Sequence, residues 1–352
     1  MDRYIGIDAH GQSCTLGVVG PSGKRLKSVV VETNGQALVE AVQGIAGRRH
    51  ICLEEGTQSA WLYELLSPFA EEVVVTVPPE SRGSKDDVRD AWKRAEELRV
   101  GGIQTKVYKA PAFLAGLRNA VRAYVFAVRD VVRAKNRLRS VFLSRGVSVD
   151  AGVYSPDRRG KCLEKLPPAH RQLADRLACQ LDELTPFRDE AEEWLLKESK
   201  SHPIIRKLKT APGMGPIRTA IVVSVVVDPH RFRTSRQFWS YCGLAVVTHS
   251  SANWIRDRLG KLVRAENTYT RGLTRKRNGS LKAVFKGAAT TVITQLPEHP
   301  LSLNYQRMLT AGKKMHLAKL TLARQIAAIV LSMWKHGEAY DPKRRVVVTD
   351  KI

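Results

Sequence analysis

Cysteine is scarce in this sequence, and the few cysteines present are isolated. The 352 residues contain five cysteines, and none forms a C-x-x-C pair, which argues against a zinc site or a disulfide framework. Apolar runs long enough to cross a bilayer are missing, as is the pattern of a signal peptide. Internal repeats and low-complexity tracts are also lacking. These absences favour a reducing, cytoplasmic setting without a membrane partner.

Acidic residues are outnumbered, and their distribution is uneven. The chain has 58 Lys and Arg against 34 Asp and Glu, a formal net charge of +24. Residues 1–100 hold 12 basic and 15 acidic residues, a net charge of −3, which leaves +27 for the remainder. A strongly basic body favours a polyanionic partner, most simply nucleic acid, over a generally solvated basic surface.

Residues 1–109 alternate between strand-like and helix-like segments. Three apolar strands are predicted in succession at 3–9, 14–20 and 26–33, and further strands at 50–55 and 72–78, with residues 105–111 closing the region. Helical segments are predicted between them at 35–47, 59–70 and 86–102. Hairpin-linked strands followed by alternating helices and strands predict a mixed sheet with helices packed on it.

Residues 110–200 change to the pattern of two long helices. A heptad-like apolar stripe runs from Leu117 to Phe142, and after a break at 146–168 a second stripe is predicted at Leu173, Leu177, Leu184, Phe187, Ala191 and Leu195. A dimerising pair of helices and a monomeric helical hairpin both fit this pattern. Residues 201–342 form a third, mostly helical region, and residues 343–352 a charged tail.

Carboxylates recur at the ends of predicted elements in the first region. Asp8 ends the first strand, where an unpaired acid is costly, and Glu54 and Glu55 end a later one. Only one of these two glutamates can share a face with Asp8, because side chains alternate along a strand. Asp87 and Asp90 lie three apart on a predicted helix and repel each other without a cation.

Such an oxygen-only set suits Mg²⁺ or Mn²⁺, and two ions about 4 Å apart could clamp the attacking and leaving oxygens of a phosphodiester. Taken alone, Asp86, Asp87 and Asp90 could instead be an N-terminal helix cap, which the helix dipole favours, and not metal ligands.

The segments "YIGIDAH", "LEEGT" and "SKDDVRDA" together resemble the RuvC-like, ribonuclease-H-fold domain of the DEDD insertion-sequence transposases. The resemblance implies that Asp8, Glu54, Asp87 and Asp90 are catalytic metal ligands. Glu54 takes the place of the family's glutamate, with Glu55 as the alternative.

The third region contains a turn and arginines suited to phosphate contacts. In "LKTAPGMGPIRTA", Gly213 and Gly215 permit a tight, helix-hairpin-helix-like turn whose amides can hold a phosphate, although such turns also simply connect helices. "DPHRFRTSRQF" follows with Arg231, Arg233 and Arg236, which are either phosphate contacts or a solvated face. Lys276 and Arg277, in "GLTRKRNGSLK", are further expected nucleic-acid contacts.

These segments also resemble, in order, the C-terminal transposase domain of the same family. The resemblance implies a nucleophilic serine at Ser250, in "THSSAN", with Ser251 as the alternative because two glycines usual in the family are absent. A serine needs activation to attack at neutral pH.

By this resemblance the fold is α/β plus α: a RuvC-like domain, a helical coiled-coil-like insertion and a mostly helical C-terminal domain. The implied function is a DNA transposase or recombinase acting through a covalent phosphoserine. Its implied partners are donor and target DNA, a guide (bridge) RNA and further copies of the chain in a dimer or tetramer. The expected setting is the prokaryotic cytoplasm, at the nucleoid. A metal-dependent junction nuclease and a non-catalytic nucleic-acid-binding protein are the alternatives.

Overall fold

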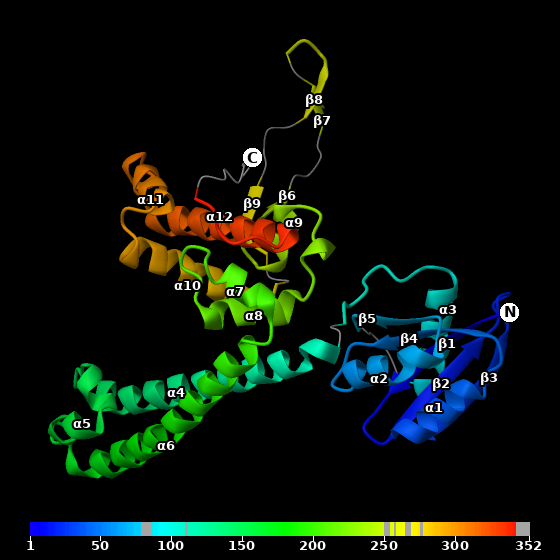
Figure 1. The fold of residues 1–352 in the computed structure, drawn as a ribbon, viewed down its shortest axis with the longest axis horizontal. Coiled ribbons are helices and arrows are strands. Elements are labelled where there is room, and N and C mark those ends of the chain that lie inside the picture. The colour runs from blue at the N-terminus through cyan, green and yellow to red at the C-terminus, as the bar shows by residue number, and fades with distance from the viewer. Residues whose placement is uncertain are drawn as a thin grey trace. The chain divides into compact units, whose positions relative to one another are not determined.

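The computed structural model describes residues 1–78, 86–109, 112–249, 254–256, 258–264, 269–274 and 277–342. The chain divides into two compact units, Met1–Ala112 and Phe113–Ile352. Figure 1 shows the first unit in blue to cyan and the second in cyan to red.

The first unit is built on a mixed five-stranded sheet with the strand order β3-β2-β1-β4-β5. The chain enters the sheet at its central strand, pairs antiparallel through β2 and β3, and then adds β4 and β5 parallel to β1. The strands are β1 (Asp2–Ala9), β2 (Ser13–Val19), β3 (Arg25–Glu32), β4 (Arg48–Glu54) and β5 (Glu72–Thr76). Past these strands, Lys106 forms an isolated bridge with Thr76.

Helices cover both faces of this sheet. The side chains of Ile5, Ile7, Ile51 and Leu53 pack in one core with α1 (Gly35–Gln43) and α2 (Ser59–Leu66). On the other face lies α3 (Asp87–Arg99), which is capped by Asp86. This ribonuclease-H-like unit, followed by a mostly helical region, confirms the predicted fold class.

Two glycines let α3 lie directly against the sheet. A Cβ atom on Gly6 would stand 1.9 Å from the Ala91 carbonyl oxygen, and one on Gly17 would stand 2.6 Å from the Trp92 ring. Both glycines are therefore required by the close approach of α3 to β1 and β2. This close approach brings the acidic start of α3 to the carboxyl end of β1.

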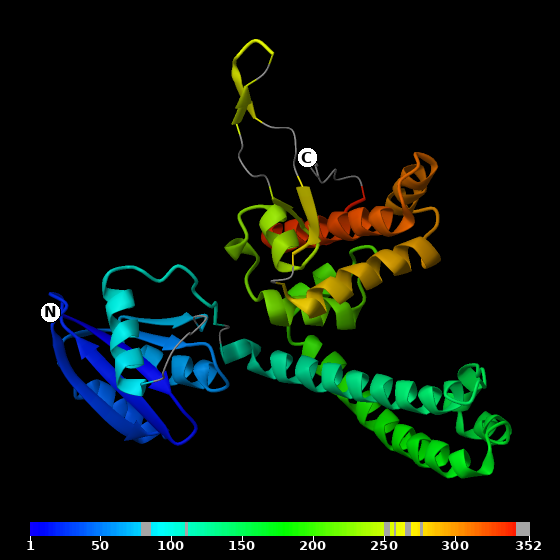
Figure 2. The same ribbon diagram turned by 180° about the vertical axis from the view of Figure 1, so that it is seen from behind.

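The second unit begins with a helical hairpin of α4 (Ala115–Leu143) and α6 (Pro168–Ser199), which run side by side in Figures 1 and 2. The short η3 (Ala151–Tyr154) and α5 (Pro156–Leu163) connect them. The predicted stripe of α4 is buried at Leu117, Val121, Val131, Leu138 and Phe142.

The stripe predicted for α6 is partly wrong. Leu173 and Phe187 are exposed, whereas Ala174, Ala178 and Leu181 are buried. The small alanines let α6 approach α4 closely, so the contact face is rotated away from the larger side chains.

The rest of the second unit is a helical bundle with short strands. Its helices are α7 (Pro203–Leu208), α8 (Pro216–Val226), η4 (Pro229–Arg231), α9 (Ser235–Tyr241), α10 (Gly279–Gln295), α11 (Pro300–Thr310) and α12 (Met315–His336). Its strands form two pairs, β6 (Val246–His249) with β9 (Tyr269–Leu273) and β7 (Trp254–Arg256) with β8 (Leu262–Arg264).

Contrary to the expectation that no apolar run is long enough to cross a bilayer, one helix among the described residues, α12, has the length and apolar composition of a membrane span. In that apolar window 61% of the residues are buried, inside the core that α8, α9 and α10 share with it. A core helix of a soluble protein has this property, and α12 is packed in that way.

Candidate metal site and nucleic-acid interface

Asp8 stands at the carboxyl end of β1, on the face that α3 covers. Ile5 and Ile7 point into the opposite core, so the alternation of side chains turns Gly6 and Asp8 towards α3. The Asp8 side chain is only 13% exposed. Burial raises the pKa of the Asp8 carboxyl, and Asp87 adds to the rise, while Arg94 and His10 oppose it.

The parallel pairing of β1 with β4 decides which glutamate lies beside Asp8. Ile7 pairs with Leu53, so the next residues along, Asp8 and Glu54, end neighbouring strands on the same face. Glu55 instead forms an ion pair with Lys109. Of the two predicted glutamates, the structure therefore brings Glu54 to Asp8.

A buried cation joins these two acids. Nη2 of Arg94, from α3, lies 3.3 Å from Oδ1 of Asp8 and 2.5 Å from Oε1 of Glu54. The Arg94 side chain is 8% exposed, and its Nε and Nη1 are buried without a hydrogen-bond partner among the described residues.

The start of α3 supplies the two predicted aspartates. Asp86 caps the helix by accepting hydrogen bonds from the Val88 and Arg89 amides. Asp87 is therefore free of the capping role, and its Oδ1 lies 3.3 Å from Nε2 of His10. The same His10 nitrogen lies 3.2 Å from Oδ2 of Asp8. Asp90 follows Asp87 by nearly one turn on the same helix.

Sequence reasoning missed His10 and Arg94. A histidine two residues beyond Asp8 is nevertheless a usable signal. Arg94 comes four residues after Asp90, hence on the same helix face. Asp8, His10 and Asp87 offer ligand atoms that all lie within 4.8 Å of one another.

These residues fit a divalent cation. Carboxylate oxygens with a histidine nitrogen suit Mg²⁺ or Mn²⁺. Two of the protein's own nitrogen atoms lie between pairs of these acids: Nη2 of Arg94 between Asp8 and Glu54, and Nε2 of His10 between Asp8 and Asp87. The Arg94 guanidinium thus offsets the negative charge of Asp8 and Glu54.

The predicted turn in the second unit separates α7 from α8. Gly213 has a φ of +71°, which favours glycine, and a Cβ there would stand 2.3 Å from the Ala288 carbonyl oxygen. Gly215 is the N-cap of α8. Arg218 donates to the Gly213 carbonyl at 2.7 Å and to Thr291 at 3.0 Å. Close packing of the turn on α10 therefore explains Gly213 on structural grounds, and its role in nucleic-acid binding stays a prediction.

The predicted basic residues of this unit are spread over several elements. The Arg231 guanidinium lies over the rings of Phe232 and Tyr241, at 5.2 and 5.1 Å, and Arg233 and Arg236 are exposed. Arg277, also exposed, donates to the Thr274 carbonyl at 3.1 Å. Ser250, Ser251 and Lys276 lie outside the described residues.

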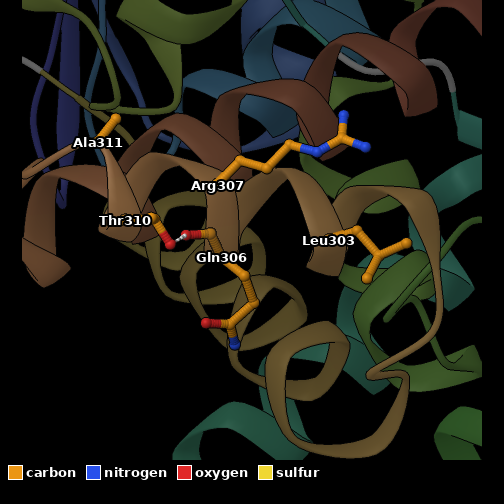
Figure 3. Close-up of a pocket in the computed structure, with 5 residues that line it drawn as sticks. All are labelled: Leu303, Gln306, Arg307, Thr310 and Ala311. Atoms are coloured by element: carbon orange, nitrogen blue, oxygen red, sulfur yellow. Dashed lines mark hydrogen bonds between the residues drawn. The ribbon is translucent and has the colours of Figure 1, made fainter.

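A hollow on α11 has a different character. It is lined by Leu303, Gln306, Arg307, Thr310 and Ala311, and Figure 3 shows Thr310 donating to the Gln306 carbonyl within the helix. It contains a single charged residue and no carboxylate. The acidic cluster of the first unit is therefore the better candidate for chemistry.

Two family profiles match successive parts of the chain. The profile of the DEDD transposases of IS110 matches residues 5–145, and that of the IS116/IS110/IS902 transposases matches residues 205–274. The chain belongs to this family of insertion-sequence transposases. It is thus a member of a family of DNA phosphoryl-transfer enzymes, and its DEDD domain implies a divalent metal.

Individual bacterial relatives are similar to this transposase over different lengths. The transposase y4pF/y4sB of Sinorhizobium fredii is 25% identical over 82% of this chain and 74% of its own. The transposase for insertion sequence element IS1328 of Yersinia enterocolitica is 24% identical, over 60% and 62%. An IS110 protein of 43.6 kDa from Streptomyces coelicolor is 32% identical, over 41% and 32%. The chain spans less than two thirds of the last two relatives.

Proposed function

We propose that this transposase cuts and exchanges DNA strands with a metal site and a nucleophilic serine. Asp8, Glu54, Asp87 and Asp90 hold a divalent cation, and Ser250 is the nucleophile. The observation that carries the proposal is that Asp8 and Glu54, from two parallel strands, both contact Nη2 of Arg94, while Asp8 and Asp87, at the start of α3, both contact Nε2 of His10.

A bound divalent cation would polarise the phosphoryl oxygens and stabilise the negative charge that develops on them. The chain's own residues fix where this happens. β1 and β4 hold Asp8 and Glu54 on one face, and the Asp86 cap leaves Asp87 and Asp90 to serve the site. The close packing at Gly6 sets the distance between α3 and the sheet.

The serine step conserves the energy of the DNA backbone. The Ser250 hydroxyl loses its proton and attacks phosphorus, and the bond from phosphorus to one DNA oxygen breaks as that oxygen takes up a proton. A hydroxyl of the incoming strand later displaces the serine oxygen and restores the phosphodiester. Support for Ser250 is the order of the family's segments in this sequence, with Ser251 as the alternative.

The proposal includes the partners of the reaction. Donor and target DNA, a bridge RNA that selects them, and a dimer or tetramer of the chain fit the coordinated cuts that strand exchange needs. The setting is the bacterial cytoplasm at the nucleoid. The residues expected at the nucleic acid are Gly213, Gly215, Arg231, Arg233, Arg236, Lys276 and Arg277.

The first test replaces Asp8 by Asn. We expect loss of Mg²⁺-dependent strand cleavage with nucleic-acid binding largely kept, because one site oxygen becomes an amide while the basic surface is unchanged. Cleavage at the wild-type rate in this variant would refute the metal site. Binding without any Mg²⁺-dependent cleavage in the wild type would favour a non-catalytic binding protein.

The second test concerns the serine and the RNA. Labelled DNA is incubated with Mg²⁺ and run on a denaturing gel, and Ser250→Ala is expected to abolish the covalent protein–DNA adduct while Ser251→Ala keeps it. The reverse result would move the nucleophile by one residue. Cleavage by the wild type without an adduct would favour a junction nuclease.

Recovery of a discrete RNA with the purified protein supports RNA guidance, and its consistent absence from active protein contradicts it.

A further inference from the structure

Four basic side chains of the second unit lie along one side of α10. They are Arg277, Lys282 and Lys286, at the start of this helix, and Arg218 of α8. We propose that this row of cations, which we call the α10 track, binds the phosphate backbone of duplex DNA without selecting its sequence. The inference rests on the proposed function, because it names the surface of the second unit that holds the DNA substrate.

Arg218 is held against α10 by fixed contacts. Its Nη1 donates to the Gly213 carbonyl at 2.7 Å and to Thr291 of α10 at 3.0 Å. A Cβ atom on Gly287 would stand 3.4 Å from both its Nε and its Nη2, so the missing side chain of Gly287 leaves room for the guanidinium. Figure 1 shows α8 and α10 side by side. Arg218 therefore lies beside the residue that directly follows Lys286.

These cations have no carboxylate to balance them. The helices α7, α8 and α10 together contain five Lys and Arg and no Asp or Glu. Among the described residues, none of the four side chains of the α10 track forms an ion pair. Burial lowers the pKa of the Lys282 ammonium, and the neighbouring charges of Arg277 and Lys286 lower it further. Like charges thus crowd one face, at a cost in free energy that an anion would relieve.

An extended polyanion fits this arrangement better than a single small anion. Lys282 and Lys286 stand one helical turn apart on α10, so a polymer of phosphates can contact both at once and release its counterions. The family of this chain acts on DNA, which makes the DNA backbone the occupant to which the proposal commits.

The track lacks side chains that would read a base sequence. Between the two lysines the exposed residue is Ala283, and Gly287 follows Lys286. Neither can reach into a groove, and a lysine ammonium binds phosphate as a point charge without paired donors. Contacts to phosphates fix the position of DNA but carry no sequence information directly. We therefore expect the α10 track to hold DNA of any sequence.

The test measures DNA affinity of the full-length protein against salt concentration, without Mg²⁺, on two short duplexes of different sequence. Each phosphate contact contributes about 0.9 to the slope of log K against log salt. We expect the double variant Lys282→Gln, Lys286→Gln to lower that slope by about 2 and the affinity by about tenfold or more, equally for both duplexes.

The matched control is the double variant Lys161→Gln, Lys165→Gln. It removes the same charge at the same sequence spacing, from exposed lysines within and just after α5. This control should keep the wild-type slope. An equal loss in the control overturns the proposal, because the effect then follows net charge and not the α10 track.

The other outcomes separate the inference from the function on which it rests. Wild-type slope and affinity in the folded Lys282→Gln, Lys286→Gln variant overturn the α10 track and leave DNA binding and the metal site standing. Unequal losses for the two duplexes overturn binding through the backbone alone. A wild type that binds no DNA overturns the proposed function together with the inference.

An RNA hairpin serves as a second probe in the same assay. Reduced affinity for the hairpin with unchanged affinity for both duplexes assigns the face to RNA and overturns the proposal. Reduced affinity for the duplexes supports it. Circular dichroism checks the fold of each variant. If the double variant does not fold, the exposed Lys286 is replaced alone, and Lys286→Gln should lower the slope by about 1; an unchanged slope overturns the proposal.

Discussion

Gly6 is the position where one added methyl group should damage both the fold and the site. In Gly6→Ala the new Cβ would stand 1.9 Å from the Ala91 carbonyl oxygen and 2.7 Å from the Ala95 amide nitrogen. Both are backbone atoms of α3, so no side-chain rotation relieves the clash. Contacts of a real Cβ essentially never fall below 3.0 Å, so α3 must move away from the sheet by about 1 Å.

The expected cost follows from this displacement. Overpacking of a well-packed core costs about 1–3 kcal/mol, and a backbone clash belongs at the upper end of that range. With a urea dependence of about 1–3 kcal/mol per molar, the unfolding midpoint of the first unit should fall by about 1 M or more. Because α3 carries Asp87, Asp90 and Arg94, a shift of about 1 Å should also reduce Mg²⁺-dependent cleavage by about 100-fold.

The measurement is urea unfolding of the full chain followed by circular dichroism, together with the cleavage rate. Gly20→Ala is the matched control, because its Cβ would meet its nearest atoms at an ordinary 3.7 Å. It should leave both quantities nearly unchanged. If Gly6→Ala unfolds at the wild-type urea concentration and cleaves at the wild-type rate, the close packing of α3 on β1 does not position the site.

Three further predictions follow from the described contacts and charges. Glu54→Gln should abolish Mg²⁺-dependent cleavage, whereas Glu55→Gln should keep most of it because Glu55 pairs with Lys109 instead; equal cleavage rates in the two variants would contradict this. DNA affinity should fall steeply with salt, by about 0.9 in log K per log unit of salt for each phosphate contacted, and a flat titration would exclude an extended phosphate interface. Arg159, 8% exposed, donates two hydrogen bonds of 2.7 Å to Asp182, which lowers the pKa of that carboxyl. Asp182→Asn should therefore cost about 1 kcal/mol at pH 7, a figure reduced for the partial exposure of Asp182. The difference in unfolding free energy should shrink as the pH falls below about 4, since the wild-type carboxylate is then protonated too; a difference independent of pH would refute the ion pair as its source.

The sequence by itself determined the elements and the chemistry to look for. The alternation of Ile5 and Ile7 with Gly6 and Asp8 indicates a strand with two different faces. The spacing of Asp87 and Asp90 indicates one helix face. Leu117 to Phe142 form a stripe that predicts the long helix α4, and the excess of Lys and Arg after residue 100 predicts a polyanionic partner. Each of these depends on short-range periodicity or on composition, which the chain displays without folding.

The tertiary structure alone decided which residues meet. A period of two allows either Glu54 or Glu55 to face Asp8, and the register of β4 against β1, with Ile7 opposite Leu53, chooses Glu54. The register of α6 against α4 was equally open, and the small side chains of Ala174 and Ala178 turned Leu173 outwards. In the local sequence, Arg94 is one more charged residue on an amphipathic helix. It becomes the partner of Asp8 and Glu54 only because the glycines of β1 and β2 bring α3 against the sheet, a long-range contact that no local pattern contains.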